Sequence, residues 1–112
     1  MAELDLLDAR LRAILAPYLD RLEPFAVYGV EMLRRPGAGA HDWVAGVRAG
    51  SNAVKFSLLP MHTHPELLEG ISWALRKNKS GASVFTFSAI DEQVLAELET
   101  LVARAFEAYE SG

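Results

Sequence analysis

The spacing of the apolar residues changes along the chain, and this change constrains the fold more than any other feature. Over residues 4 to 22, apolar side chains recur every three or four positions, which is the period of one face of a helix. Over residues 25 to 59 they alternate with polar side chains, which is the period of a strand. The helical spacing returns over residues 90 to 109. We therefore predict helices on both sides of a central run of strands.

The first and last helices have identifiable breaks and ends. The first is predicted over residues 3 to 22, and Pro17 inside it removes one backbone donor, so we expect a kink or a break there. The last helix is predicted to begin after Asp91, because aspartate is a favoured N-cap. Its exposed face is rich in glutamates, which we interpret as a solubilising surface.

A third, shorter helix is predicted between the strands. Thr63 and Glu66 have the spacing of a capping box, and Pro65 suits a first helical turn. His64 is the alternative cap, because a residue before proline avoids helical geometry. The polar run at residues 76 to 81 is predicted to end this helix and to form a turn into the next strand.

Four strands are predicted, over residues 25–33, 41–49, 53–59 and 83–87. The turns between the first three are the segments 36–40 and 50–52, which are rich in Gly, Pro, Ser and Asn. Connections this short require antiparallel neighbours, so the first three strands should form a meander.

These elements predict an α+β fold in the order α-β-β-β-α-β-α, with a four-stranded antiparallel sheet and helices packed on one face. With 112 residues and 51% hydrophobic side chains, the chain is long enough for one core, and we expect a single domain over 1–112. The expected core side of the sheet consists of Tyr28, Val30, Met32, Trp43, Val47, Val54, Phe56, Leu58 and Phe85. The open side is expected to consist of Glu31, Arg48, Lys55, Ser57 and Thr86.

Composition excludes several function classes. The chain has no cysteine, so thiolate metal sites, cysteine nucleophiles and disulfides are excluded. Its 11 Lys and Arg against 15 Asp and Glu leave a net charge of −4, which argues against a nucleic-acid partner. Charged residues interrupt the first apolar stretch before it reaches signal-peptide or membrane-spanning length, so we expect a cytoplasmic protein with no membrane partner.

Three separated motifs resemble the YdhG-like family of small bacterial domains. The motifs are Tyr28-Gly29, the segment 57–61 (Ser-Leu-Leu-Pro-Met), and Lys79-Ser80-Gly81 followed by the apolar segment 84–87. Glu31 stands where the family usually has proline. The resemblance implies an α+β fold. One branch of the family is described as frataxin-like iron chaperones, which implies iron or another divalent metal as an alternative ligand.

Two groups of residues are candidates for binding. His62 and His64 are two positions apart and precede Glu66, so the three side chains are a candidate metal site, against the alternative of solvated or capping histidines. The basic turn with Arg76, Lys77 and Lys79 is a candidate contact for phosphates or an acidic partner, against the alternative of a solvated helix end. Together with Tyr28, Lys55 and Ser57 on the sheet, this turn forms the predicted ligand site, and we expect a concavity at Lys55 or at the turn.

The chain contains no nucleophile elbow, phosphate loop or dinucleotide fingerprint, so we expect no enzyme activity and no cofactor. We predict a binding or interaction module for a small anionic ligand or a protein partner. The alternative is an iron or divalent-metal chaperone. A third hypothesis is a homodimer that depends on Trp73.

Overall fold

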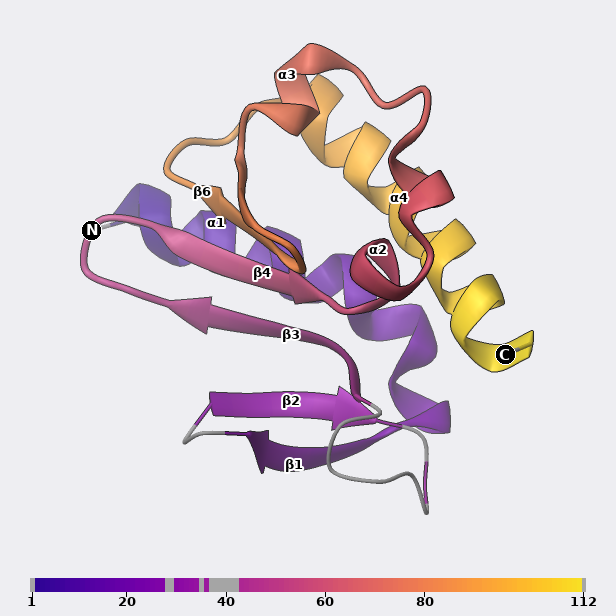
Figure 1. Ribbon diagram of the computed structural model, residues 1–112. Helices are drawn as coiled ribbons and strands as arrows, with labels where there is room; N and C mark the ends of the chain where they lie inside the picture. Colours follow the sequence, from indigo (N-terminus) through magenta and orange to yellow (C-terminus); the bar gives the residue numbers. More distant parts are fainter. Residues whose placement is uncertain (1, 28–29, 35, 37–42, 112) are drawn as a thin grey trace.

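The computed structural model describes residues 2–27, 30–34, 36 and 43–111 (Figure 1). The first predicted helix consists of two elements, the α-helix α1 (Ala2–Leu15) and the 3-10 helix η1 (Ala16–Arg21). Pro17 lies in the first turn of η1, where its missing N–H removes a helical hydrogen bond. The predicted break at Pro17 is therefore confirmed.

The sheet has six antiparallel strands, so the prediction of an α+β fold is confirmed and the prediction of a four-stranded sheet is wrong. In spatial order the strands are β1, β2, β3, β4, β6 and β5. Their bounds are Glu23–Val27 (β1), Val30–Arg34 (β2), Trp43–Ala49 (β3), Val54–Leu58 (β4), Lys79–Gly81 (β5) and Val84–Phe87 (β6).

The first additional strand arises because the predicted strand 25–33 is a hairpin. Val27 and Val30 lie opposite each other in the β1–β2 ladder, with only residues 28 and 29 between them. Because so few residues separate the two strands, their combined sequence still alternates like one strand. This is why residues 25–33 were predicted as a single strand. The second additional strand, β5, is three polar residues long, too short for its alternation to be recognised.

The predicted middle helix is also wrong, because the segment contains three short elements instead of one. These are α2 (Pro60–Thr63), the 3-10 helix η2 (Pro65–Leu68) and α3 (Trp73–Arg76). His64 takes a non-helical conformation before Pro65, and Gly70 has φ +83°, which favours glycine and ends the helical path. No capping box forms, because Thr63 ends α2 and its hydroxyl instead lies 3.0 Å from Nδ1 of His64.

Two long helices cover one side of the sheet. Figure 1 shows α1 running behind β4, and α4 (Glu92–Ser111) lying beyond it, beside α2 and α3. Asp91 caps α4 as predicted, because its Oδ1 accepts hydrogen bonds from the backbone N–H groups of Gln93 (3.1 Å) and Val94 (3.3 Å). The core between the helices and the sheet includes five of the six predicted residues from β3, β4 and β6, namely Val47, Val54, Phe56, Leu58 and Phe85.

A bulge between β2 and β3 changes which residues reach this core. Leu33 lies opposite Ala45, but the next residue of β2, Arg34, lies opposite Trp43, so Val44 is an extra residue in β3. Val44 is fully buried in the core, whereas Trp43 is half-buried and lies outside it. Met32 is buried, with 8% of its surface exposed, as predicted. The prediction of Trp43 as a core residue is wrong, whereas Tyr28 and the side chain of Val30 lie outside the described part of the chain.

Candidate anion-binding site

Two cations face each other across the β3–β4 hairpin. Arg48 and Lys55 lie directly opposite each other in the ladder. The neighbouring pairs are Val47 with Phe56 on one side and Ala49 with Val54 on the other. Because successive side chains of a strand point to opposite faces, the burial of Val47 and Phe56 in the core places the two cations on the open face. Both are exposed.

The end of this hairpin is concave. The hairpin hollow has a volume of about 360 Å³ and is lined by Arg48, Ala49, Gly50, Ser51, Asn52, Ala53 and Lys55. The N–H of Gly50 donates a hydrogen bond of 2.8 Å to the carbonyl oxygen of Ala53 and so closes the turn. A Cβ atom at position 50 would lie 3.1 Å from that oxygen, so a glycine keeps the turn this tight. The predicted concavity at Lys55 is present.

The two cations lack a compensating acid in the described part of the chain. The ion pairs found there use Arg10, Arg12, Arg21 and Arg34, and neither Arg48 nor Lys55 lies within 4.0 Å of a carboxylate of a described residue. Like charges directly opposite each other in a ladder destabilise the pair of strands. A bound anion would remove this repulsion, so the arrangement favours anion binding.

Neutral polar side chains continue the row away from the hollow. Thr86 of β6 lies opposite Lys55 in the β4–β6 ladder. The hydroxyl of Ser80 in β5 lies 2.7 Å from the hydroxyl of Thr86. Ser57, two positions along β4 from Lys55, is half-buried on the same face. The polar row therefore crosses four strands, from Arg48 through Lys55 and Thr86 to Ser80.

The cations of the basic turn are engaged elsewhere. Nη2 of Arg76 donates a hydrogen bond of 2.7 Å to the carbonyl oxygen of Leu68, and Nζ of Lys77 lies 5.2 Å from the centre of the Trp73 ring. Lys79 precedes Ser80 in β5, so its side chain is directed to the face opposite Ser80 and Thr86. The structure therefore does not place these three residues together with Lys55 and Ser57.

The candidate metal residues are dispersed over the α2–η2 region. His62 is exposed in α2, His64 is half-buried between the two elements, and Glu66 is exposed in η2. Within the described ranges, no group of three or more His, Asp or Glu side chains is placed to hold a metal ion. The structure thus provides no metal centre around these residues.

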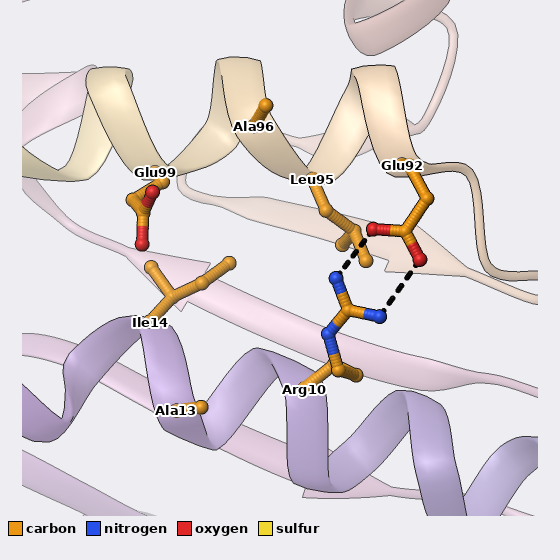
Figure 2. A pocket seen from close by; sticks show the side chains of 7 residues that line it. All are labelled: Arg10, Ala13, Ile14, Glu92, Leu95, Ala96 and Glu99. Atoms are coloured by element: carbon orange, nitrogen blue, oxygen red, sulfur yellow. Dashed lines mark hydrogen bonds and ion pairs between the residues drawn. The ribbon is translucent and has the colours of Figure 1, made fainter.

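A second hollow lies between the two long helices, and we call it the α1–α4 groove. Figure 2 shows Arg10 of α1 reaching the carboxylate of Glu92 in α4, with hydrogen bonds of 2.8 and 2.5 Å. These hydrogen bonds lower the pKa of Glu92. Because the charge of Arg10 is already balanced by Glu92, the groove offers no free cation and is a poorer candidate for an anion.

Sequence reasoning placed Arg48 on the open face but did not include it among the ligand-binding residues. The predicted turn at residues 50–52 did not indicate the pair, because residues placed symmetrically about it are Arg48 and Val54. The hairpin of the structure turns over residues 50–53 and so places Arg48 opposite Lys55. The contact between Arg10 and Glu92 had no signal either, because the two residues are 82 positions apart.

The helices in the described part of the chain are all too short or too polar to cross a membrane. No family model, curated protein or solved structure matches the chain. The resemblance to the YdhG-like family therefore stays a prediction.

Proposed function

We propose that this protein is a non-enzymatic binding module that recognises an anionic group of a small ligand at the β3–β4 hairpin. The observation that carries the proposal is the pair of exposed cations, Arg48 and Lys55, that line one hollow without an acid partner among the described residues. The hollow of about 360 Å³ falls within the range of small-molecule sites, roughly 300 to 1,000 Å³. Its size therefore favours a small ligand over the acidic surface of a protein partner.

The chemistry of the two cations suits a carboxylate or a phosphate. The planar fork of the Arg48 guanidinium binds two oxygens of one anion, and the Lys55 ammonium adds a mobile point charge. Because both cations are exposed, water screens each contact, and exposed ion pairs contribute only about 0.2–1 kcal/mol each. We therefore expect weak binding, with Kd values for simple anions on the order of tens of millimolar.

The test is an NMR titration of the ¹⁵N-labelled protein with inorganic phosphate. We expect saturable shifts confined to residues 48–55, and we expect Arg48→Gln or Lys55→Gln to weaken binding by up to about fivefold. Arg104→Gln is the matched control, because it removes one exposed positive charge from α4, far along the chain from the hairpin. Equal losses in all three variants, or shifts spread over the whole surface, would contradict the proposal.

The proposal also includes a cytoplasmic location and a place in the YdhG-like family of bacterial domains. The order and spacing of the motifs at residues 28–29, 57–61 and 79–87 support that family, and the α+β class agrees with it. The alternative role of an iron or divalent-metal chaperone is supported only by this resemblance. Saturable shifts of the His62 and His64 ring resonances on addition of Zn²⁺ would favour the alternative.

A further inference from the structure

Lys55 occupies the middle of the polar row, and its two neighbours differ in chemistry. On one side is Arg48 of β3, and on the other side is Thr86 of β6. Lys55, one of the two residues proposed to hold the anion, is therefore one strand away from a hydroxyl. The hydroxyl of Thr86 is itself held by the hydroxyl of Ser80 at 2.7 Å. A ligand that binds the cations thus lies beside a fixed pair of hydroxyl groups.

We infer that the ligand is a phosphate monoester with a hydroxyl on its organic part, the phosphate lying between Arg48 and Lys55 and the hydroxyl reaching Thr86. The inference rests on the proposed function and names the ligand class of that site. Its basis is the combination of two uncompensated charges in one hollow with two neutral hydroxyls in the next positions of the same row.

The charge of the site favours phosphate over carboxylate. A phosphate monoester carries about −1.5 to −2 charges at pH 7, which balances the two cations, whereas a single carboxylate carries −1 and leaves one cation uncompensated. The three terminal phosphate oxygens also provide enough acceptors for the Arg48 fork and for Lys55 together. A carboxylate has two oxygens and cannot satisfy both cations as fully.

The hydroxyls favour a ligand that also carries a hydroxyl. A hydroxyl provides one donor and two acceptor positions, so the pair formed by Thr86 and Ser80 retains one donor and three acceptors after its own hydrogen bond. This pair can therefore both donate to and accept from a ligand hydroxyl. Neighbouring strands lie about 4.8 Å apart, so a phosphate midway between Arg48 and Lys55 is about 7 Å from the position of Thr86. A hydrogen bond spans about 2.8 Å of this distance, and the remaining distance of about 4 Å matches a hydroxyl on the second carbon from the phosphate oxygen.

Three probes separate the parts of the inference. Glycerol 3-phosphate has the phosphate and the hydroxyl, glycerate has a carboxylate and also two hydroxyls, and inorganic phosphate has no organic part. In NMR titrations at pH 7.5 we expect glycerol 3-phosphate to bind about fivefold more tightly than glycerate. We expect glycerol 3-phosphate to bind about fivefold more tightly than inorganic phosphate. If glycerate binds as tightly as glycerol 3-phosphate, the ligand class is wrong while the anion site stands. If none of the three shifts residues 48–55, the proposed function itself fails.

The Thr86→Val variant tests the role of the hydroxyl, because valine keeps the shape and removes the oxygen. We expect it to weaken glycerol 3-phosphate binding about fivefold and to leave inorganic phosphate binding unchanged. Thr100→Val is the matched control on α4, where the hydroxyl donates to the carbonyl oxygen of Ala96 and not to the sheet. The inference about the hydroxyl would be overturned if the Thr86→Val variant bound glycerol 3-phosphate normally. It would also be overturned if the variant lost affinity for glycerol 3-phosphate and for inorganic phosphate by the same factor.

Discussion

Individual contacts decide which arginines of this protein are available to a ligand. Arg12 lies 3.0 Å from the carboxylate of Asp8, and Arg21 lies 2.9 Å from that of Glu110. Arg76 is held by a backbone carbonyl instead. Arg48 has no acid within ion-pair distance in the described part of the chain. The availability of an arginine for binding therefore follows from its partners and not from its exposure alone.

The pair of Arg10 and Glu92 gives a prediction about pH. Because the hydrogen bond from Arg10 lowers the pKa of Glu92 in the folded state, the pair stabilises the fold above the ordinary pKa of glutamate. That contribution is lost as the pH falls through the lowered pKa. We expect Arg10→Gln to raise the pKa of Glu92 toward its ordinary value, as measured by ¹³C NMR of the side-chain carboxyl. Arg104→Gln should leave the pKa of Glu92 where it is, and an equal rise in both variants would contradict this assignment.

The aromatic residues Phe56 and Trp73 lie in opposite environments, so their alanine variants should differ in stability. Phe56 is 0% exposed in the central strand β4, whereas Trp73 is 73% exposed on α3. We expect Phe56→Ala to lower the free energy of unfolding by about 3–5 kcal/mol, as measured by urea denaturation. Trp73→Ala removes only the contact with Lys77 and should cost less than about 1 kcal/mol. Similar costs for the two variants would contradict the packing described above.

Trp73 also tests the homodimer hypothesis. The mass of the 112-residue chain is 12.3 kDa, so a dimer is easily distinguished by sedimentation equilibrium. If the chain pairs through α3, the apparent mass should rise with concentration and Trp73→Ala should return it to 12.3 kDa. A dimer that persists in the variant would mean that Trp73 is not in the interface.

At the scale of elements, the N-terminus of α4 depends on one side chain. Asp91 accepts hydrogen bonds from two backbone N–H groups that the helix itself leaves without partners. We expect Asp91→Ala to lower the free energy of unfolding by about 1 kcal/mol. Asp20→Ala in η1 is the control, because Asp20 is exposed and caps no helix. Thermal or urea unfolding of the two variants makes the comparison, and equal losses would argue against the cap.

The strands differ in how much of the core they contribute. All three inward residues of β4 are buried in the core cluster, but of the described side chains of β2 only Leu33 packs against it. Opening β2 therefore exposes less apolar surface than opening β4. We expect the amide hydrogens of β2 to exchange with solvent faster than that of Phe56, as measured by NMR. Equal protection would mean that the sheet opens only as a whole.

At the scale of the whole molecule, placing both long helices on one face determines where a ligand can bind. The radius of gyration of 13.2 Å is that of a compact chain of this length, about 13 Å. The core lies between α1, α4 and the sheet, so the other face keeps its charged row in contact with water. A local charge of two cations on a molecule with net charge −4 favours a small anion over a large anionic polymer, which the rest of the surface repels.

The sequence predicted the features that depend on neighbouring residues. The break at Pro17, the cap at Asp91 and the position of the strand that contains Phe56 follow from local backbone chemistry and from side-chain alternation. The position of Lys55 beside a concave turn was predictable for the same reason. The ligand site as a whole was not, because Arg76 and Lys77 contact Leu68 and Trp73, and Lys79 is directed to the other face of the sheet.

What the sequence determined by itself is the break at Pro17, the start of α4 after Asp91, the turn between β3 and β4, and which side chains are apolar. Only the tertiary structure decided that the sheet has six strands, that a bulge at Val44 moves Trp43 out of the core, and that Arg10 is neutralised by Glu92. The physical reason is the distance along the chain between the residues that determine each feature. Turns and caps are set within a few residues, whereas strand pairing, register and ion pairs depend on which distant segments are brought together when the apolar surface is buried.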